Sequence, residues 1–125
     1  MSPTRKALAG FWVFAGGMHF VIPRSYEVTV PPNSPVPPKQ AVAISGIAEI
    51  AGGLAVLDDR TLSAARWGLL ALLVAVFPAN VHMAMHPEQV PGLDLDRIPR
   101  WLLWVRLPLQ PLCAWWVWRG TAPGA

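Results

Sequence analysis

Four apolar segments alternate with short polar ones along the chain, and each is long enough to form several helical turns. The pattern predicts helices over residues 6–22, 40–57, 61–85 and 100–119. A helix that crosses the hydrocarbon core of a bilayer needs about 17 to 25 predominantly apolar residues, and all four segments fall in that range. The predicted fold class is all-α, an antiparallel four-helix transmembrane bundle that forms a single membrane domain over residues 1–125.

The composition is typical of a membrane protein. Of the 125 residues, 54% are hydrophobic and 14% are charged, which is too apolar for an ordinary soluble domain of this size. The single cysteine excludes an intramolecular disulfide and a CxxC redox pair. Tryptophans flank both ends of the last segment, as in the aromatic belts of membrane–water interfaces: Trp101, Trp104, Trp115, Trp116 and Trp118.

The basic residues indicate an orientation and argue against nucleic-acid binding. They give a net charge of +3, but they are dispersed at the ends of the apolar segments and form no basic stripe. Four spans put both termini on the same side of the membrane. That side carries five Lys and Arg residues, and the opposite side carries four. Because Arg5 and Lys6 flank the first helix, we expect cytoplasmic termini in a prokaryotic cell membrane. We interpret residues 6–22 as a retained helix and not as a cleaved signal peptide.

Prolines and glycines mark the connections and the helix contacts. Residues 24–39 hold five of the fourteen prolines, which predicts an extended, polyproline-like surface segment. A stiff connector is favoured there over a substrate lid. Pro78 inside the third helix frees the carbonyl of Val74 and predicts a bend. The first helix has three glycines at which a neighbouring backbone can approach closely: Gly10, Gly16 and Gly17.

The second helix carries a carboxylate, Glu49, near its middle, where an ionisable group is costly unless it faces protein, a partner or water. Helices rise 1.5 Å per residue, so depths can be compared from the end that faces the two longer loops. His19 lies roughly 5 Å deep, Asn80 and Arg106 roughly 8 Å, and Glu49 roughly 14 Å. All four therefore fall in the same half of the bundle.

Helical spacing separates inward from outward polar positions. Residues three or four apart share a face, which groups Ser45 with Glu49 on the second helix and Arg106 with Gln110 on the fourth. Asn80 and His82 are two apart and cannot both face one pocket unless the bend at Pro78 rotates them, and we place Asn80 inside. The hypothesis is a small polar pocket whose candidate ligand-binding residues are His19, Ser45, Glu49, Asn80, Arg106 and Gln110.

Inside this pocket, Glu49 and Arg106 are expected to compensate each other's charge. The alternative is a buried ion pair that fixes the helix register and binds nothing. For His19, a hydrogen-bonded residue at the membrane interface is favoured over a ligand-binding or metal-ligating role. With His82 or His86 it could supply two axial haem ligands, but the sequence has no haem-attachment motif. His82 and His86 also lack the adjacent glutamate of an HExxH site, so no metal site is predicted.

Four short segments resemble the DoxX-like family of small four-helix integral membrane proteins: HFVIP at 19–23, SGIAEIAGG at 45–53, FPANVHM at 77–83 and RLPLQ at 106–110. The resemblance covers nearly the whole chain in the right order. It implies a four-helix membrane bundle and makes Glu49, Asn80, Arg106 and Gln110 the family-like polar positions. The family is named after a subunit associated with thiosulfate:quinone oxidoreductase, and other members are linked to membrane redox or oxidative-stress complexes.

The resemblance and the polar cluster together lead to a functional hypothesis. We expect an accessory subunit of a membrane redox or quinone-linked complex, with no cofactor built into the chain. A quinone-like head group would receive hydrogen bonds from Arg106 and Gln110, while Glu49 or His19 handles protons. Electron transfer would need that bound quinone or a redox partner subunit. The alternative is a non-enzymatic structural or small-solute-binding membrane protein.

Overall fold

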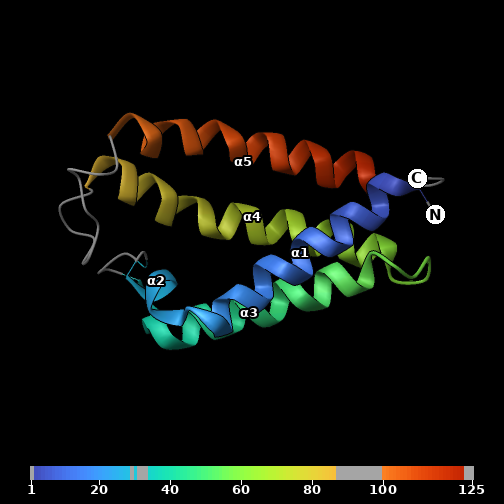
Figure 1. Ribbon diagram of the computed structural model, residues 1–125, viewed down its shortest axis with the longest axis horizontal. Helices are drawn as coiled ribbons and strands as arrows, with labels where there is room; N and C mark the ends of the chain where they lie inside the picture. The colour runs from blue at the N-terminus through green and yellow to red at the C-terminus, as the bar shows by residue number, and fades with distance from the viewer. Residues whose placement is uncertain (1, 29, 31–33, 87–99, 123–125) are drawn as a thin grey trace.

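The computed structural model describes residues 2–28, 30, 34–86 and 100–122, and every regular element among them is a helix. The long helices are α1 (Pro3–Val21), α3 (Pro38–Ala55), α4 (Leu62–Met85) and α5 (Arg100–Gly120), and a short helix α2 (Pro23–Glu27) follows α1 (Figure 1). The bounds of the long helices differ from the expected ranges by only a few residues. The all-α, four-helix part of the prediction is confirmed.

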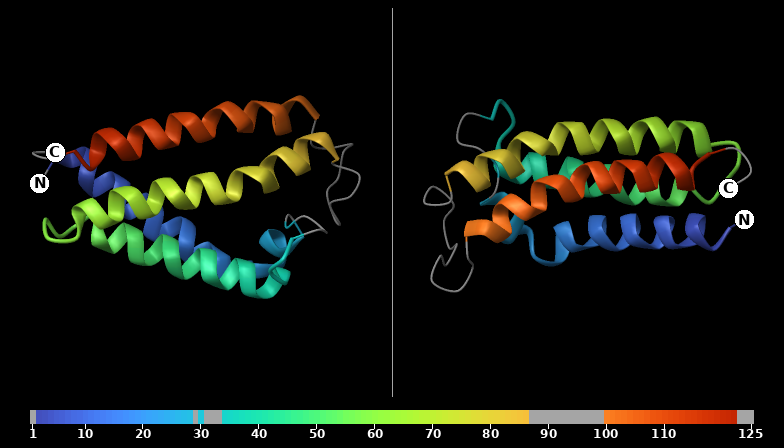
Figure 2. Two further views of the ribbon diagram at one scale, coloured as in Figure 1. Left: turned by 180° about the vertical axis from the view of Figure 1, so that it is seen from behind. Right: turned by 90° about the horizontal axis from the view of Figure 1, so that it is seen from above.

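The four long helices form two antiparallel pairs, α1 with α3 and α4 with α5, and contacts between α3 and α4 join the pairs. The turn between α3 and α4 lies at the end where α1 begins and α5 ends (Figure 2). This end is called the termini end below. The opposite end carries α2, the start of α3 and the end of α4 (Figure 1), and is called the loop end.

Glycines set the contact between α1 and α3. A Cβ atom added at Gly16 would lie 2.7 Å from the carbonyl oxygen of Gly46, and one added at Gly53 would lie 3.0 Å from the carbonyl oxygen of Ala9. Both contacts are backbone on backbone, so neither position accepts a side chain without separating the helices. The expectation of close approach is confirmed for Gly16. It is wrong for Gly10 and Gly17, where an added Cβ would meet nothing within 4 Å.

Residues at the helix starts explain where the helices begin. The Ser2 hydroxyl accepts a hydrogen bond from the backbone N–H of Arg5 and caps α1. Pro23 and Pro38 stand at the first positions of α2 and α3, where proline fixes the helical φ and its missing N–H is no loss. The expected extended conformation is therefore wrong at the start of residues 24–39, since α2 includes Arg24. Residues 29 and 31–33 lie outside the described part.

The turn between α3 and α4 is closed by side chains. Arg5 reaches across from α1, donating from Nε to the carbonyl of Val56 at 2.6 Å and placing Nη1 2.7 Å from Asp59. It thereby caps the C-terminal end of α3. Hydrogen bonds from the side chain and backbone of Arg60 hold the pKa of the Asp58 carboxyl below its ordinary value.

The apolar core is small and the outside of the bundle is apolar. One cluster gathers at the termini end around Leu8, Trp12, Leu69 and Val117. Many large hydrophobic side chains are instead exposed, on every long helix. Among the described residues, α4 alone is long and apolar enough to cross a membrane by length and composition. Only 22% of its most apolar stretch is buried, whereas the core helix of a soluble protein would be mostly buried.

Candidate functional site

A buried cluster of polar side chains lies between α1 and α3. Nε2 of His19 is 2.9 Å from Oε2 of Glu49, and each residue is only 8% exposed. The Ser45 hydroxyl lies one turn before Glu49 on α3 and donates to the same Oε2 at 3.1 Å. The absence of side chains at Gly16 and Gly46 lets the helices approach closely here, because Gly46 packs on the Cβ of His19. His19 and Glu49 are called the dyad below.

The contacts of His19 limit the protonation forms of the dyad. Nδ1 lies 2.8 Å from the carbonyl oxygen of Ala15, and because a carbonyl only accepts, Nδ1 must carry a hydrogen. Nε2 and Oε2 approach to 2.9 Å, which requires one proton between them, since two lone pairs would repel. The dyad is thus either an imidazolium with a carboxylate or an imidazole with a carboxylic acid. In both forms it holds one transferable proton.

Tyr26 of α2 covers the dyad from the loop end. Its ring stacks on that of His19, with centroids 4.0 Å apart and planes 19° apart. Burial, and then the negative charge of Glu49, raises the pKa of the Tyr26 hydroxyl above its ordinary value. The sequence reasoning missed this residue, because it treated residues 24–39 as extended. Pro23, a favourable first residue for a helix, was the available signal.

A second polar cluster lies between α4 and α5. Nδ2 of Asn80 donates to Oε1 of Gln110 at 2.5 Å, and Nε2 of Gln110 donates to the carbonyl of Leu73 at 3.0 Å. This carbonyl is adjacent to that of Val74, which Pro78 leaves without its helical donor. Gln110 therefore supports the backbone beside the proline, as expected for a helix break next to a neighbouring helix.

Arg106 completes this second cluster. Its Nη1 lies 3.3 Å from the sulfur of Met83 and its Nη2 lies 3.5 Å from Oδ1 of Asn80, a weak set of contacts for a guanidinium. No carboxylate lies within salt-bridge distance of Arg106 among the described residues. Its positive charge is therefore not balanced within the described part of the chain.

The expected pairing of Glu49 with Arg106 is wrong, because the side chain that pairs with Glu49 is that of His19. Depths counted from each helix end made His19 much shallower than Glu49. That comparison fails since α3 extends past the end of α1, alongside α2 (Figure 1). Axial position also does not say which helices are neighbours, and α3 packs along α1.

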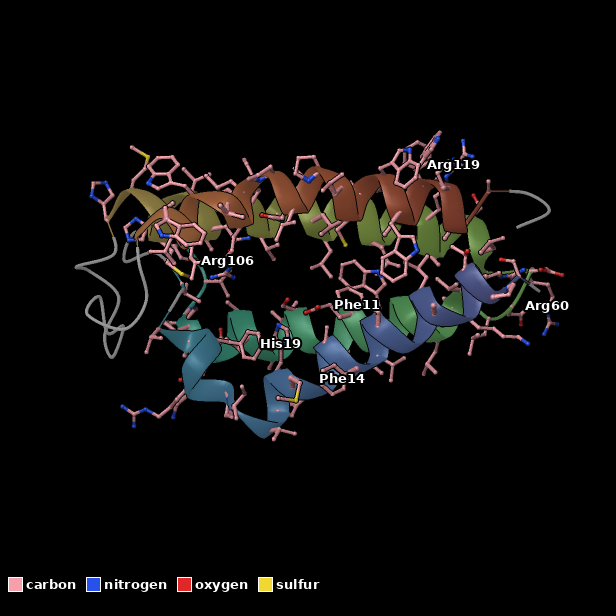
Figure 3. All side chains as sticks on the ribbon, turned by 45° about the horizontal axis from the view of Figure 1, so that its top comes forward. Phe11, Phe14, His19, Arg60, Arg106 and Arg119 are labelled. Carbon is pink, nitrogen blue, oxygen red and sulfur yellow. The ribbon has the colours of Figure 1, made fainter. Side chains whose placement is uncertain are left out.

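The two clusters face each other across the bundle. Figure 3 shows Arg106 projecting from the α4–α5 pair toward the α1–α3 pair, where His19 lies in the same half of the molecule. Cys113 shares a face of α5 with Arg106 and Gln110 by helical spacing. The six candidate residues thus form two groups, one on each helix pair.

The remaining histidines form a separate feature. The rings of His82 and His86 lie 5.4 Å apart, one turn from each other at the end of α4, whereas Asn80 is the residue that meets Gln110. Because both ring nitrogens of His19 are engaged by Ala15 and Glu49, the geometry gives no support to an axial haem ligand there. In the described part, no three His, Cys, Asp or Glu side chains gather as a metal site would require.

Comparison with known proteins gives a family and no activity. Neither a curated protein nor a solved structure matches the chain. Residues 8–121 match a family described as a domain of unknown function, DUF8561. This match runs from the second turn of α1 to the residue after α5 and so includes both polar clusters. The chain therefore belongs to the DUF8561 family.

Proposed function

We propose that the chain is a membrane-embedded four-helix bundle that binds a quinone-like head group between its helix pairs, as an accessory subunit of a membrane redox complex. One observation carries the proposal. The one-proton dyad of His19 and Glu49 lies in the same half of the bundle as Arg106, whose guanidinium has no carboxylate partner among the described residues. A buried proton donor and acceptor opposite an uncompensated cation suits a ligand whose oxygens gain and lose protons.

The exposed apolar surface supports membrane embedding. Phe14 of α1, Ile47 of α3, Val74 of α4 and Leu112 of α5 are all exposed, whereas soluble monomers rarely expose apolar patches larger than a few hundred Å². In a bilayer these side chains would contact acyl chains. On this proposal α1, α3 and α5 cross beside α4, and their polar residues face the protein interior or the interfaces.

The contacts of each polar group assign roles within the proposed site. Gln110 already uses its amide on Asn80 and Leu73, so Arg106 is the donor left for a ligand carbonyl. The contacts of Glu49 in the described part are both to Oε2, which leaves Oε1 to accept a hydrogen bond from a ligand hydroxyl. The dyad would first give up the transferable proton that it holds. It could then accept the proton released by such a hydroxyl.

The redox part of the proposal comes from the resemblance to the DoxX-like family. Oxidation of a quinol releases two protons and two electrons. The dyad takes protons one at a time, and the electrons go to a partner subunit that carries a redox centre. The chain itself contributes binding, orientation and proton transfer.

Quinone binding by the purified protein tests the proposal. We expect a short-chain ubiquinone or menaquinone analogue to bind the detergent-solubilised protein, and Arg106→Gln to weaken binding on the order of tenfold, as for loss of a hydrogen bond to a charged group. Glu49→Gln should also weaken it. The matched control is Arg24→Gln, which removes one exposed charge from α2 at the loop end and should leave binding unchanged. Equal binding by wild type, Arg106→Gln and Glu49→Gln would contradict the proposal.

One observation favours the non-enzymatic alternative. Apart from Arg106, each cluster satisfies its hydrogen bonds mainly within its own helix pair, as expected if the polar groups only fix the fold. On this alternative, no quinone analogue binds and Arg106→Gln leaves the protein unchanged in both stability and ligand content.

A further inference from the structure

The distribution of charge between the two ends of the bundle is unequal. In the sequence, residues 22–40 and 86–100, which include the loop-end connections, carry four basic and four acidic side chains. Inside the bundle, the formal charges of Arg106 and Glu49 sum to zero, although the two groups do not pair. The whole net charge of +3 therefore belongs to the termini end, where five basic residues stand against Asp58 and Asp59: Arg5, Lys6, Arg60, Arg66 and Arg119.

Three of these five cations have no carboxylate within salt-bridge distance in the described part: Lys6 and the two guanidinium groups of Arg66 and Arg119. Arg5 pairs with Asp59 and Arg60 pairs with Asp58, but in the described residues no acidic group lies within salt-bridge distance of Arg66 or Arg119. The guanidinium of Arg66 has one long hydrogen bond, 3.3 Å to the carbonyl of Trp118, and its Nε has no hydrogen-bond partner in the described part.

The guanidinium groups of Arg66 and Arg119 both lie against tryptophans of α5. Arg66 lies 3.2 Å from the ring centroid of Trp118, and Arg119 lies 5.8 Å from that of Trp115. Stacking positions a guanidinium without neutralising it. Figure 3 shows Arg119 at the outer side of α5, at the termini end. These residues form the Arg–Trp cluster: Arg66, Trp115, Trp118 and Arg119.

An apolar stripe runs from this cluster along the outside of α5. Its members recur three or four residues apart and all are exposed: Trp101, Val105, Pro108, Leu112 and Trp115. The cationic Arg–Trp cluster next to this long exposed apolar stripe matches a molecule with an anionic head group and acyl chains. A free phosphate ion would contact only the cations and would leave the apolar stripe uncovered.

We infer that the Arg–Trp cluster and the α5 stripe form a binding site for an anionic phospholipid, with the phosphate on Arg66 and Arg119 and an acyl chain along the stripe. Guanidinium groups bind phosphate oxygens through paired hydrogen bonds, and basic clusters beside membrane helices bind anionic head groups. The inference rests on the membrane embedding in the proposed function and not on the quinone site.

The test is lipid retention by the protein purified in detergent and measured by native mass spectrometry. We expect dioleoyl phosphatidylglycerol to be retained on the order of tenfold more than dioleoyl phosphatidylcholine. Arg66→Gln with Arg119→Gln should abolish the preference. The control, Arg24→Gln with Lys39→Gln, removes the same charge from the loop end and should keep it. Because Arg66 also joins α4 to α5, the exposed Arg119→Gln alone provides a second variant and should lower the preference.

Three results would overturn the inference. If wild type retains both lipids equally, or if the loop-end control loses the preference as fully as the cluster variant, no specific site exists at the termini end. Release of the protein from cell membranes by alkaline carbonate would overturn the membrane embedding and this site with it. Stable embedding without lipid preference would overturn the lipid site alone, and quinone binding would be unaffected.

Discussion

At the residue scale, the dyad is the most consequential local arrangement. His19 and Glu49 are both buried, and each compensates the other's desolvation. Removing one partner of a buried pair leaves the other uncompensated and is far more damaging than replacing both with apolar groups. Arg106, which is exposed and has no carboxylate partner among the described residues, has no comparable structural task.

This difference predicts the stability of three variants. His19→Leu should lower the free energy of unfolding by about 3 kcal/mol, since it leaves Glu49 buried without its counter-charge. Adding Glu49→Leu should recover much of that loss. Arg106→Gln should change stability little. Thermal unfolding in detergent measures all three, and a larger loss for Arg106→Gln than for His19→Leu would show that the charge pairing is misassigned.

At the element scale, the contact between α1 and α3 determines which residues meet. Gly16 pairs with Gly46 and Ala9 with Gly53, so the same antiparallel register recurs one heptad apart along both helices. That register places His19 beside Ser45 and Glu49. Small residues in this contact therefore position the dyad as well as holding the helices together.

The two adjacent glycines of α1 offer a matched test of this contact. Gly16→Ala should lower the free energy of unfolding by about 1 to 3 kcal/mol, because the new methyl group meets backbone atoms that cannot move alone. Gly17→Ala, with open space around its Cβ, should be neutral or stabilising by up to about 1 kcal/mol. Equal effects of the two substitutions on thermal unfolding would contradict the close α1–α3 contact.

At the scale of the whole molecule, the bundle is asymmetric along its long axis. The excess positive charge lies at the termini end, and the dyad and Arg106 lie nearer the loop end (Figure 3). Positive residues next to membrane helices remain on the cytoplasmic side, so the proposed site would open toward the opposite side of the membrane. On the proposed membrane embedding, a ligand or partner would then approach from the non-cytoplasmic face.

Orientation can be measured directly. We expect a fluorescent protein fused after residue 125 to fluoresce in a bacterial host, and alkaline phosphatase fused at the same position to be inactive. The physical reason is the termini-end charge excess of three. Active phosphatase with a dark fluorescent fusion would place the termini outside and reverse the assignment.

The sequence by itself determined the number, type and limits of the long helices, because apolar runs bounded by proline, glycine and charge carry that information locally. From spacing on a single helix, it also put Asn80 rather than His82 inward, where Asn80 meets Gln110. The short helix α2 was not predicted, because one proline at a favourable position is a weak signal when several other prolines follow it.

Only the tertiary structure decided which polar residues are partners. Spacing fixes neighbours within a helix, but the pairing of helices depends on how closely two backbones can pack, and Gly16 on Gly46 brings α1 against α3. Glu49 therefore meets His19, while Arg106, on a helix paired with α4, keeps its charge uncompensated by any described carboxylate. The electrostatic character of the candidate site follows from that choice of neighbours.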